Sequence, residues 1–218
     1  MIDILLPALG QTIYMSLVST ILAVIIGFGL AIVLILTSKD GLRENKTIYS
    51  ILDLVINTLR SFPFIILMIV LFPLTKILIG QSIGTTAAII PLTIGAAPFV
   101  ARLIESALKE VDTGVIEAAK SFGASDFQII FKVMLVEALP AIISAVTLTL
   151  ITIIGFSAMA GAVGGGGLGD VAIKYGYYRF QTDTMIYTVI ILIALVQFVQ
   201  SLGDYFYKIT KKQKEKND

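Results

Sequence analysis

The sequence contains no cysteine and no histidine, and only 14% of its 218 residues are charged. Without cysteine, the chain has no disulfide, no thiol nucleophile and no thiolate metal site. Without histidine, it lacks the commonest general base and the commonest metal ligand of enzymes. A phosphate-binding G-x-x-x-x-G-K-[ST] segment is also missing, so the chain does not itself bind ATP through such a loop. These absences argue against a catalytic chain.

Hydrophobic residues make up 57% of the sequence, and several apolar runs reach the length of about 20 residues that a membrane-spanning helix needs. The alternating, turn-punctuated segments of a membrane β-barrel are missing. The fold class predicted is therefore all-α and polytopic, as one transmembrane domain over residues 1–218. The N-terminus lacks the basic region and cleavage site of a secretory signal, so the first span is expected to be retained.

Five apolar stretches are expected to cross the membrane. A lead-in over residues 1–11, where Pro7 and Gly10 mark a turn, is expected before the first one. The predicted spans cover residues 13–36, 48–79, 85–108, 136–163 and 185–207, with a polar loop over residues 170–184. The second stretch is too long for one untilted crossing, and Arg60 and Pro63 interrupt it. Its first part is therefore expected to be an interfacial or cytoplasmic extension.

Lysine and arginine are distributed unequally about these spans. Only Lys76, Lys174 and Arg179 fall on the same side as the N-terminus. The other side holds Lys39, Arg43, Lys46, Arg102, Lys109, Lys120, Lys132 and the tail lysines Lys208, Lys211, Lys212, Lys214 and Lys216. Because basic residues accumulate on the cytoplasmic side, the N-terminus is predicted to be outside and the C-terminus in the cytoplasm.

The longest stretch that a bilayer would reject lies between the third and fourth spans, at residues 112–140. Its pattern predicts two short helices. Asp112, or the threonine after it, caps the first helix, and Gly123 supplies the left-handed residue that ends it. Ser125 begins the second helix, and Gln128 completes a capping box. A helix–glycine–helix element between two spans is expected to dock a partner protein in the cytoplasm.

The same stretch resembles a known motif. Glu117-Ala118-Ala119, then Gly123, then the aliphatic pair Val133 and Leu135, is similar to the "EAA" loop of bacterial ABC-importer permeases. The chain departs from that pattern at Val136, where the family usually has proline. The resemblance implies a cytoplasmic coupling element over about residues 110–136. Its ATPase-coupling residues would be Glu117, Ala118, Ala119, Gly123 and Ser125.

The resemblance extends over about residues 10–207. The strings RSFPF at 60–64, IPLTIGAAPF at 90–99, and residues 161–170 with the Tyr-Gly-Tyr at 175–177 are similar to the methionine-import branch of these permeases. This implies a type I importer fold of five helices and a homodimer in the bacterial cell membrane. It also implies two cytoplasmic ATPase subunits that bind the ATP and Mg²⁺, an external binding lipoprotein, and no cofactor in this chain.

The run of glycines at 164–169 satisfies the dinucleotide pattern G-x-G-x-x-G, but a membrane span rather than a strand precedes it, which excludes that site. Two interpretations remain open. Gly164, Gly167 and Gly169 form either a flexible, close-packing turn or a hinge at the outer mouth of a transport pathway.

The fourth span carries small and mildly polar residues at Ser144, Thr147, Thr152, Gly155, Ala158 and Ala162. They serve either helix packing, with hydroxyls bonded to their own backbone, or the lining of a pathway with Met159 as part of an apolar gate. Arg60 is either an intramembrane functional charge, with Asp53 as a partner, or a side chain that reaches the interface. Arg102 and Glu105 are expected to pair on a helix surface.

The expected function is therefore the membrane subunit of an ATP-driven importer of methionine. Another small amino acid or organic solute is the first alternative. An ion-coupled secondary transporter is a weaker one, because Asp and Glu lie almost wholly outside the predicted spans. A membrane enzyme is the weakest, since no paired carboxylates are predicted within the spans to replace histidine and cysteine.

Overall fold

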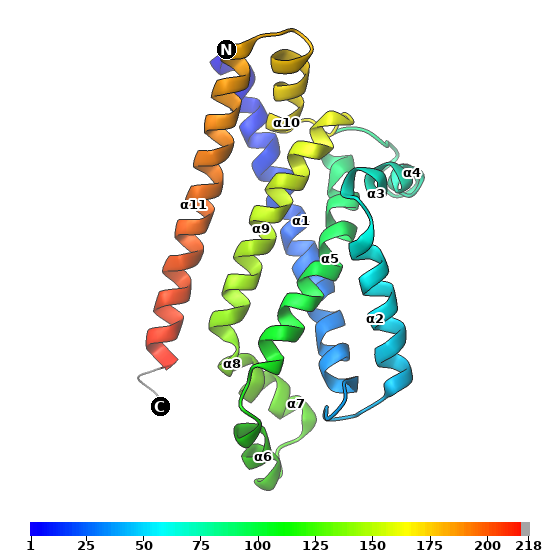
Figure 1. Ribbon diagram of the computed structural model, residues 1–218, viewed down its shortest axis with the longest axis vertical. Coiled ribbons are helices and arrows are strands. Elements are labelled where there is room, and N and C mark those ends of the chain that lie inside the picture. Colours follow the sequence, from blue (N-terminus) through cyan, green and yellow to red (C-terminus); the bar gives the residue numbers. More distant parts are fainter. Residues whose placement is uncertain (215–218) are drawn as a thin grey trace.

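The computed structural model describes residues 1–214 as an elongated bundle of helices (Figure 1). Every regular element in that range is helical, which confirms the all-α prediction. Four helical segments are long and apolar enough to cross a membrane, and the bent pair α2–α3 makes a fifth span if it counts as one crossing. The long helices are α1 (Ile2–Thr37), α5 (Thr85–Lys109), α9 (Leu139–Ala162) and α11 (Thr182–Lys214).

The expected turn in the first eleven residues is wrong. Helix α1 begins at Ile2 and continues without a break through Pro7 and Gly10. Its first turns are held by distant residues, because Leu5 and Ala8 are buried in a cluster with Leu168 and Val171. A proline near a helix start leaves only one backbone acceptor without its donor, and this tertiary contact outweighs that loss.

The second apolar stretch is three helices rather than one. Helix α2 (Lys46–Ser61) and helix α3 (Phe64–Val70) meet at an angle of 104°, and α4 (Phe72–Ile79) follows. The break falls at Phe62-Pro63, where proline disfavours helical geometry in the residue before it. Helix α2, the part expected to be an interfacial or cytoplasmic extension, packs beside α1 and α5 as part of the bundle (Figure 1).

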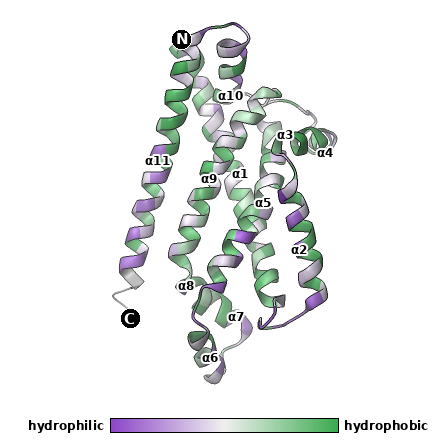
Figure 2. Cartoon of the chain, in the orientation of Figure 1, coloured by the Kyte–Doolittle hydropathy of each residue, from purple (hydrophilic) through white to green (hydrophobic). Residues whose placement is uncertain are grey.

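The core of the bundle lies between α1 and α5, which pack along their lengths. Gly27 of α1 permits their close approach, since a Cβ added there would lie 2.6 Å from Cβ of Val100. Helix α9 joins this core, whereas α11 packs on α9 at the periphery, with most of its side chains exposed (Figure 1). The N-terminal half of α11 is largely apolar, as a lipid-facing helix requires, and polar residues become frequent toward its C-terminal end (Figure 2).

The expected polar loop after the glycine run is also helical. Helix α10 (Gly167–Val171) continues into a π-helical segment, η2 (Ala172–Tyr177), before the chain turns into α11. Gly176 lies against Met185 at the start of α11, so this small hairpin is packed on the bundle.

The two ends of the bundle differ in character. The N-terminus and α10 lie at one end, and α6 and the C-terminal part of α11 lie at the other (Figure 1). Lys39, Arg43 and Lys120 belong to that second end, which agrees with the side that the distribution of basic residues assigns to the cytoplasm. The tail residue Lys216 lies outside the described residues.

Substituting Gly27 tests the packing of α1 on α5. Gly27→Ala is expected to lower the stability of the purified protein by about 1–3 kcal/mol, because the added methyl group must push Val100 or the helix aside. Gly29→Ala is the matched control, since a Cβ at Gly29 meets nothing within 4 Å. Thermal unfolding in detergent measures both. Equal transition temperatures for the two variants would contradict this account of the core.

Candidate coupling site

Helix α6 (Thr113–Ser121) is the first part of the expected docking element, and both of its ends are capped. At its start, the Gly114 amide donates to Oδ1 of Asp112 at 2.6 Å. At its end, the Ala124 amide donates to the carbonyl of Ala119 and the Gly123 amide to that of Lys120. Gly123 has φ of +78°, and these two bonds form a Schellman motif. The predicted caps at Asp112 and Gly123 are confirmed.

The second helix begins where the sequence predicts. Ser125 accepts the Gln128 amide, and the Gln128 side chain accepts the Ser125 amide at 2.8 Å, so the capping box is complete. The helix α7 (Asp126–Gln128) passes directly into the π-helical η1 (Ile129–Met134) and α8 (Leu135–Glu137), and α9 follows with Pro140 in its first turn. The element is therefore continuous with a membrane span at both ends.

One side of α6 is anchored and the other is free. Ile116 and Ala119 pack against the buried core, together with Ala124 of the following turn. Glu117 and Ala118 are exposed on the opposite side. Arg43 of the α1–α2 loop adds an ion pair to Asp126 at 2.5 Å. The element is thus fixed to the bundle while it presents a surface outward.

An aromatic residue that the sequence analysis missed dominates that surface. Phe122 is 91% exposed at the tip between α6 and α7, and Phe127 is 65% exposed. Bulky apolar side chains that are surrounded by water in a single chain mark a surface for a partner. The available signal was Phe122 directly before the capping glycine, inside a polar segment where no core is expected.

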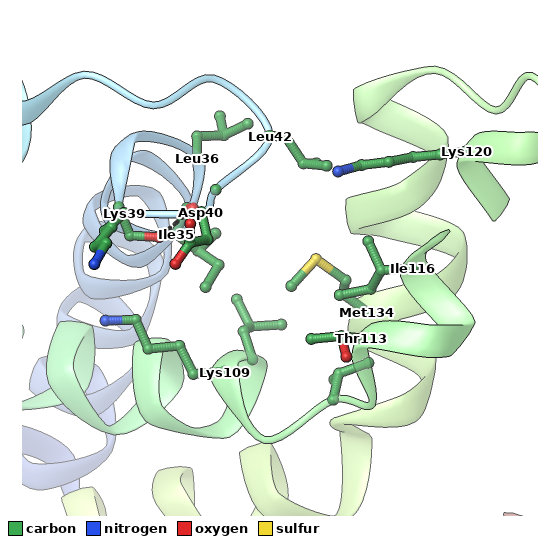
Figure 3. Close-up of a pocket in the computed structure, with 14 residues that line it drawn as sticks. Ile35, Leu36, Lys39, Asp40, Leu42, Lys109, Thr113, Ile116, Lys120 and Met134 are labelled. Carbon is green, nitrogen blue, oxygen red and sulfur yellow. Dashed lines mark hydrogen bonds between the residues drawn. The ribbon is translucent and has the colours of Figure 1, made fainter. Parts of the chain in front are cut away.

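A cavity of about 330 Å³ lies between α6 and the ends of α1 and α5 (Figure 3). Ile116 and Met134 face Leu42 and Ile35 across it, and lysine side chains lie around these apolar walls (Figure 3). Side chains do not fill the space behind α6. The contact of α6 with the ends of α1 and α5 is therefore only partly packed.

Comparison with known proteins identifies a family that matches most of the chain. The family described as "Binding-protein-dependent transport system inner membrane component" matches residues 23–212. The chain belongs to this family.

Its relatives carry related descriptions. The chain is 55% identical over 202 residues to the probable D-methionine transport system permease protein MetI of Vibrio cholerae, covering 93% of this chain and 90% of that protein. It is 47% identical to the methionine import system permease protein MetP of Bacillus subtilis, covering 83% and 81%. A chain in inward-facing conformations of the MetNI methionine ABC transporter superposes with a TM-score of 0.95 at 41% identity, covering 96% and 97%.

The structure of this family member divides the predicted pathway residues of α9 into two groups. Ser144, Gly155 and Met159 lie on one exposed face, and Met159 is 49% exposed. Thr147 lies elsewhere, because a Cβ added at Gly203 of α11 would lie 2.3 Å from its side chain. The hydroxyls of Ser144, Thr147 and Thr152 all donate to backbone carbonyls four residues earlier. Thr147 therefore fits the packing interpretation, while the exposed face stays available for a pathway.

The three glycines predicted as an outer hinge lie in a tightly packed junction. Gly164 and Gly167 have φ of +89° and +77°, where side chains are strained. A Cβ at Gly169 would lie 2.3 Å from the carbonyl oxygen of Ala158. The Gly167 amide donates to Gln11 of α1 at 2.8 Å. These contacts favour the close-packing turn over the hinge.

Asp53, the possible partner of Arg60, bonds elsewhere in the structure. Arg60 is exposed in the last turn of α2, and Asp53 forms its ion pair with Arg102 instead. Arg102 and Glu105 were expected to pair on a helix surface, and the surface location is wrong. The two side chains do bond, but Glu105 is buried between α5 and α2. The partners on α2 lie about fifty residues away in the sequence, so local spacing did not reveal them.

Removing the capping box tests whether it stabilises the start of the second helix. Ser125→Ala is expected to cost about 0.5–2 kcal/mol of local stability, because the Gln128 amide loses its acceptor. Hydrogen–deuterium exchange of segment 123–130 should become faster. Ser121→Ala is the matched control, since that exposed hydroxyl only donates back to the carbonyl of Glu117. Unchanged exchange in Ser125→Ala would contradict the role of the cap.

Proposed function

We propose that the chain is the membrane permease subunit of an ATP-binding-cassette importer for methionine. Two copies form the translocation pathway in the bacterial cell membrane. Two separate ATPase subunits in the cytoplasm bind ATP and Mg²⁺, and a binding protein outside delivers the substrate. This chain contributes no catalysis of its own.

The observation that carries the proposal is the capped element at residues 112–128. It is fixed to the core through Ile116 and Ala119, and it presents Glu117 and Phe122 to a partner. Such an element transmits force well because capped, anchored helices move as rigid bodies. The family match and the methionine-transporter relatives supply the partner class and the substrate.

The exposed face of α9 supports a pathway between two copies. Ser144, Leu148, Gly155 and Met159 recur at the helical period, and a Cβ at Gly155 would meet nothing within 4 Å. A second copy placed against this face would enclose a passage lined by small and apolar side chains. Methionine needs only such an adaptable apolar passage, without a charged site.

An ion-coupled transporter remains the rival class, and the buried Glu105 is the residue that it would use. Both carboxylate oxygens of Glu105 are already engaged, one by Arg102 and the other by Lys109. Because both oxygens already bond to cations within the chain, the side chain is poorly placed to bind a coupling ion. This arrangement favours the ATP-driven class.

Reversing the charge of Glu117 tests the proposed coupling surface. Glu117→Lys should leave membrane insertion and folding intact, because the side chain is exposed. It should abolish methionine uptake and substrate-stimulated ATP hydrolysis in the complex reconstituted with its ATPase. Glu44→Lys, the same exchange at an exposed site outside α6, should retain both. Full uptake by Glu117→Lys would remove the proposed mechanism.

The exposed face of α9 is tested by thiol labelling, for which the cysteine-free chain provides a clean background. Met159→Cys should react at different rates in ATP-bound and nucleotide-free complexes, because the pathway between the copies opens and closes. Ile153→Cys, six residues earlier and fully buried, should react in neither state. Identical labelling of position 159 in the two states would count against an apolar gate there.

A further inference from the structure

A cluster of charged and polar side chains joins α2 to α5 inside the bundle. On α5, Glu105 is only 2% exposed, and its carboxylate bonds to Arg102 at 2.7 Å and to Lys109 at 2.6 Å. From α2, the Tyr49 hydroxyl donates to the same carboxylate at 3.1 Å, and Asp53 forms an ion pair with Arg102. Two carboxylates and two cations therefore balance each other across the helix contact.

The spacing of these residues makes two matched stripes. Tyr49, Asp53 and Asn57 recur every four residues on one face of α2, and Arg102, Glu105 and Lys109 recur at three and four on α5. Asn57 completes the set, since it donates to Asp53 at 3.1 Å and accepts from Arg102 at 3.3 Å. The contact is therefore polar along two turns of each helix.

The outer face of α2 has the opposite character. Ile48, Ile51, Leu54 and Val55 are exposed on it, so the helix turns apolar side chains outward and polar ones toward α5 (Figure 2). This distribution suits a helix whose outside faces lipid, where charged groups are strongly disfavoured unless paired. Separating α2 from α5 would leave Glu105 without its α2 donor and would leave Asp53 without Arg102.

Helix α2 also leads to α9. After the 104° bend, Phe64 of α3 stacks on Phe156 of α9, with ring centroids 4.3 Å apart and planes 2° from parallel. At its other end, the cluster lies close to α6, because only residues 110–112 separate Lys109 from the start of that helix. The cluster thus stands between the coupling element and the contact of α3 with α9.

We propose that Glu105 is a positioning residue of the transport cycle. The ion cluster clamps α2 to α5, so that the two helices move as one body when α6 is displaced. The bend then carries α3, with Phe64, across α9. This inference rests on the proposed function, since it requires an ATPase that displaces α6.

A cross-link between α2 and α5 tests the clamp without altering its charges. Ile56 and Ala101 are buried in one small cluster with Leu34 of α1, so Ile56→Cys with Ala101→Cys is the pair to cross-link, and formation of the link is verified before uptake is measured. The doubly substituted chain is reconstituted with its ATPase and binding protein, and methionine uptake is measured before oxidation, after oxidation and after reduction. Uptake should be the same in all three.

The contrasting pair is Phe64→Cys with Phe156→Cys, which joins α3 to α9. That cross-link should stop uptake, and reduction should restore it, because α3 must move across α9. The proposal is overturned if the α2–α5 cross-link stops uptake reversibly. Failure of the unsubstituted complex to import methionine with ATP would instead overturn the proposed function, and the clamp with it.

A charge substitution supplies the second measurement. Glu105→Gln keeps the shape but removes the charge, so α6 should move without carrying α2. Methionine imported per ATP hydrolysed should fall on the order of tenfold, while assembly with the ATPase and basal hydrolysis persist. Glu105→Asp, which keeps the charge, should import more methionine per ATP hydrolysed than Glu105→Gln. Glu44→Gln, the same exchange at an exposed acid outside the coupling element, should leave the ratio unchanged. An unchanged ratio in Glu105→Gln would overturn the proposal, and if that variant fails to assemble, the cross-link decides.

Discussion

The short connection between α5 and α6 is the constraint on which the rest of the structure depends. Only residues 110–112 separate a membrane span from α6, the helix that we propose meets the ATPase. Val111 in this connection is itself buried in the core. A displacement of α6 therefore acts directly on α5. The cavity behind α6 gives that displacement somewhere to go, and the caps keep the helix intact while it moves.

In this bundle, apolar side chains face outward and charged side chains between helices are paired, as a membrane protein requires. Exposed apolar side chains line the N-terminal half of α11 and the outer face of α2, while Asp53 of α2 and Arg102 of α5 pair across the helix contact. Close helix packing is achieved with small residues, as at Gly27 against Val100. Rigid contacts of this kind allow a movement at one end to reach the other, and the exposed face of α9 is the surface that such a movement would rearrange.

The parts of the fold that depend on neighbouring residues could be predicted from the sequence. The caps at Asp112, Gly123 and Ser125 follow from short-range side-chain chemistry, and the break at Pro63 follows from steric restriction of the residue before it. The family was indicated by the resemblance of the Glu-Ala-Ala loop to the EAA loop of ABC-importer permeases. Each of these signals lies within one continuous segment of about twenty residues or fewer, so distant contacts did not obscure it.

The features that sequence reasoning missed depend on distant contacts. The first turns of α1 are stabilised by Leu168 and Val171, which are more than 150 residues away. The burial of Glu105 could not be predicted because Tyr49, which bonds to it, and Asp53, which pairs with Arg102, lie on another helix. The exposure of Phe122 depends on how the loop projects from the bundle. No periodicity in the sequence encodes these placements.

The mechanism that we propose requires the ATPase subunits to displace α6, and α5 with it. A single spin label at Lys120→Cys, on the otherwise cysteine-free chain, gives one distance between the two copies in the assembled dimer. Pulsed electron resonance should show that this distance changes when ATP binds to the complex with its ATPase. In the permease without the ATPase, ATP should have no effect. A distance that stays constant in complexes that import methionine would contradict the account.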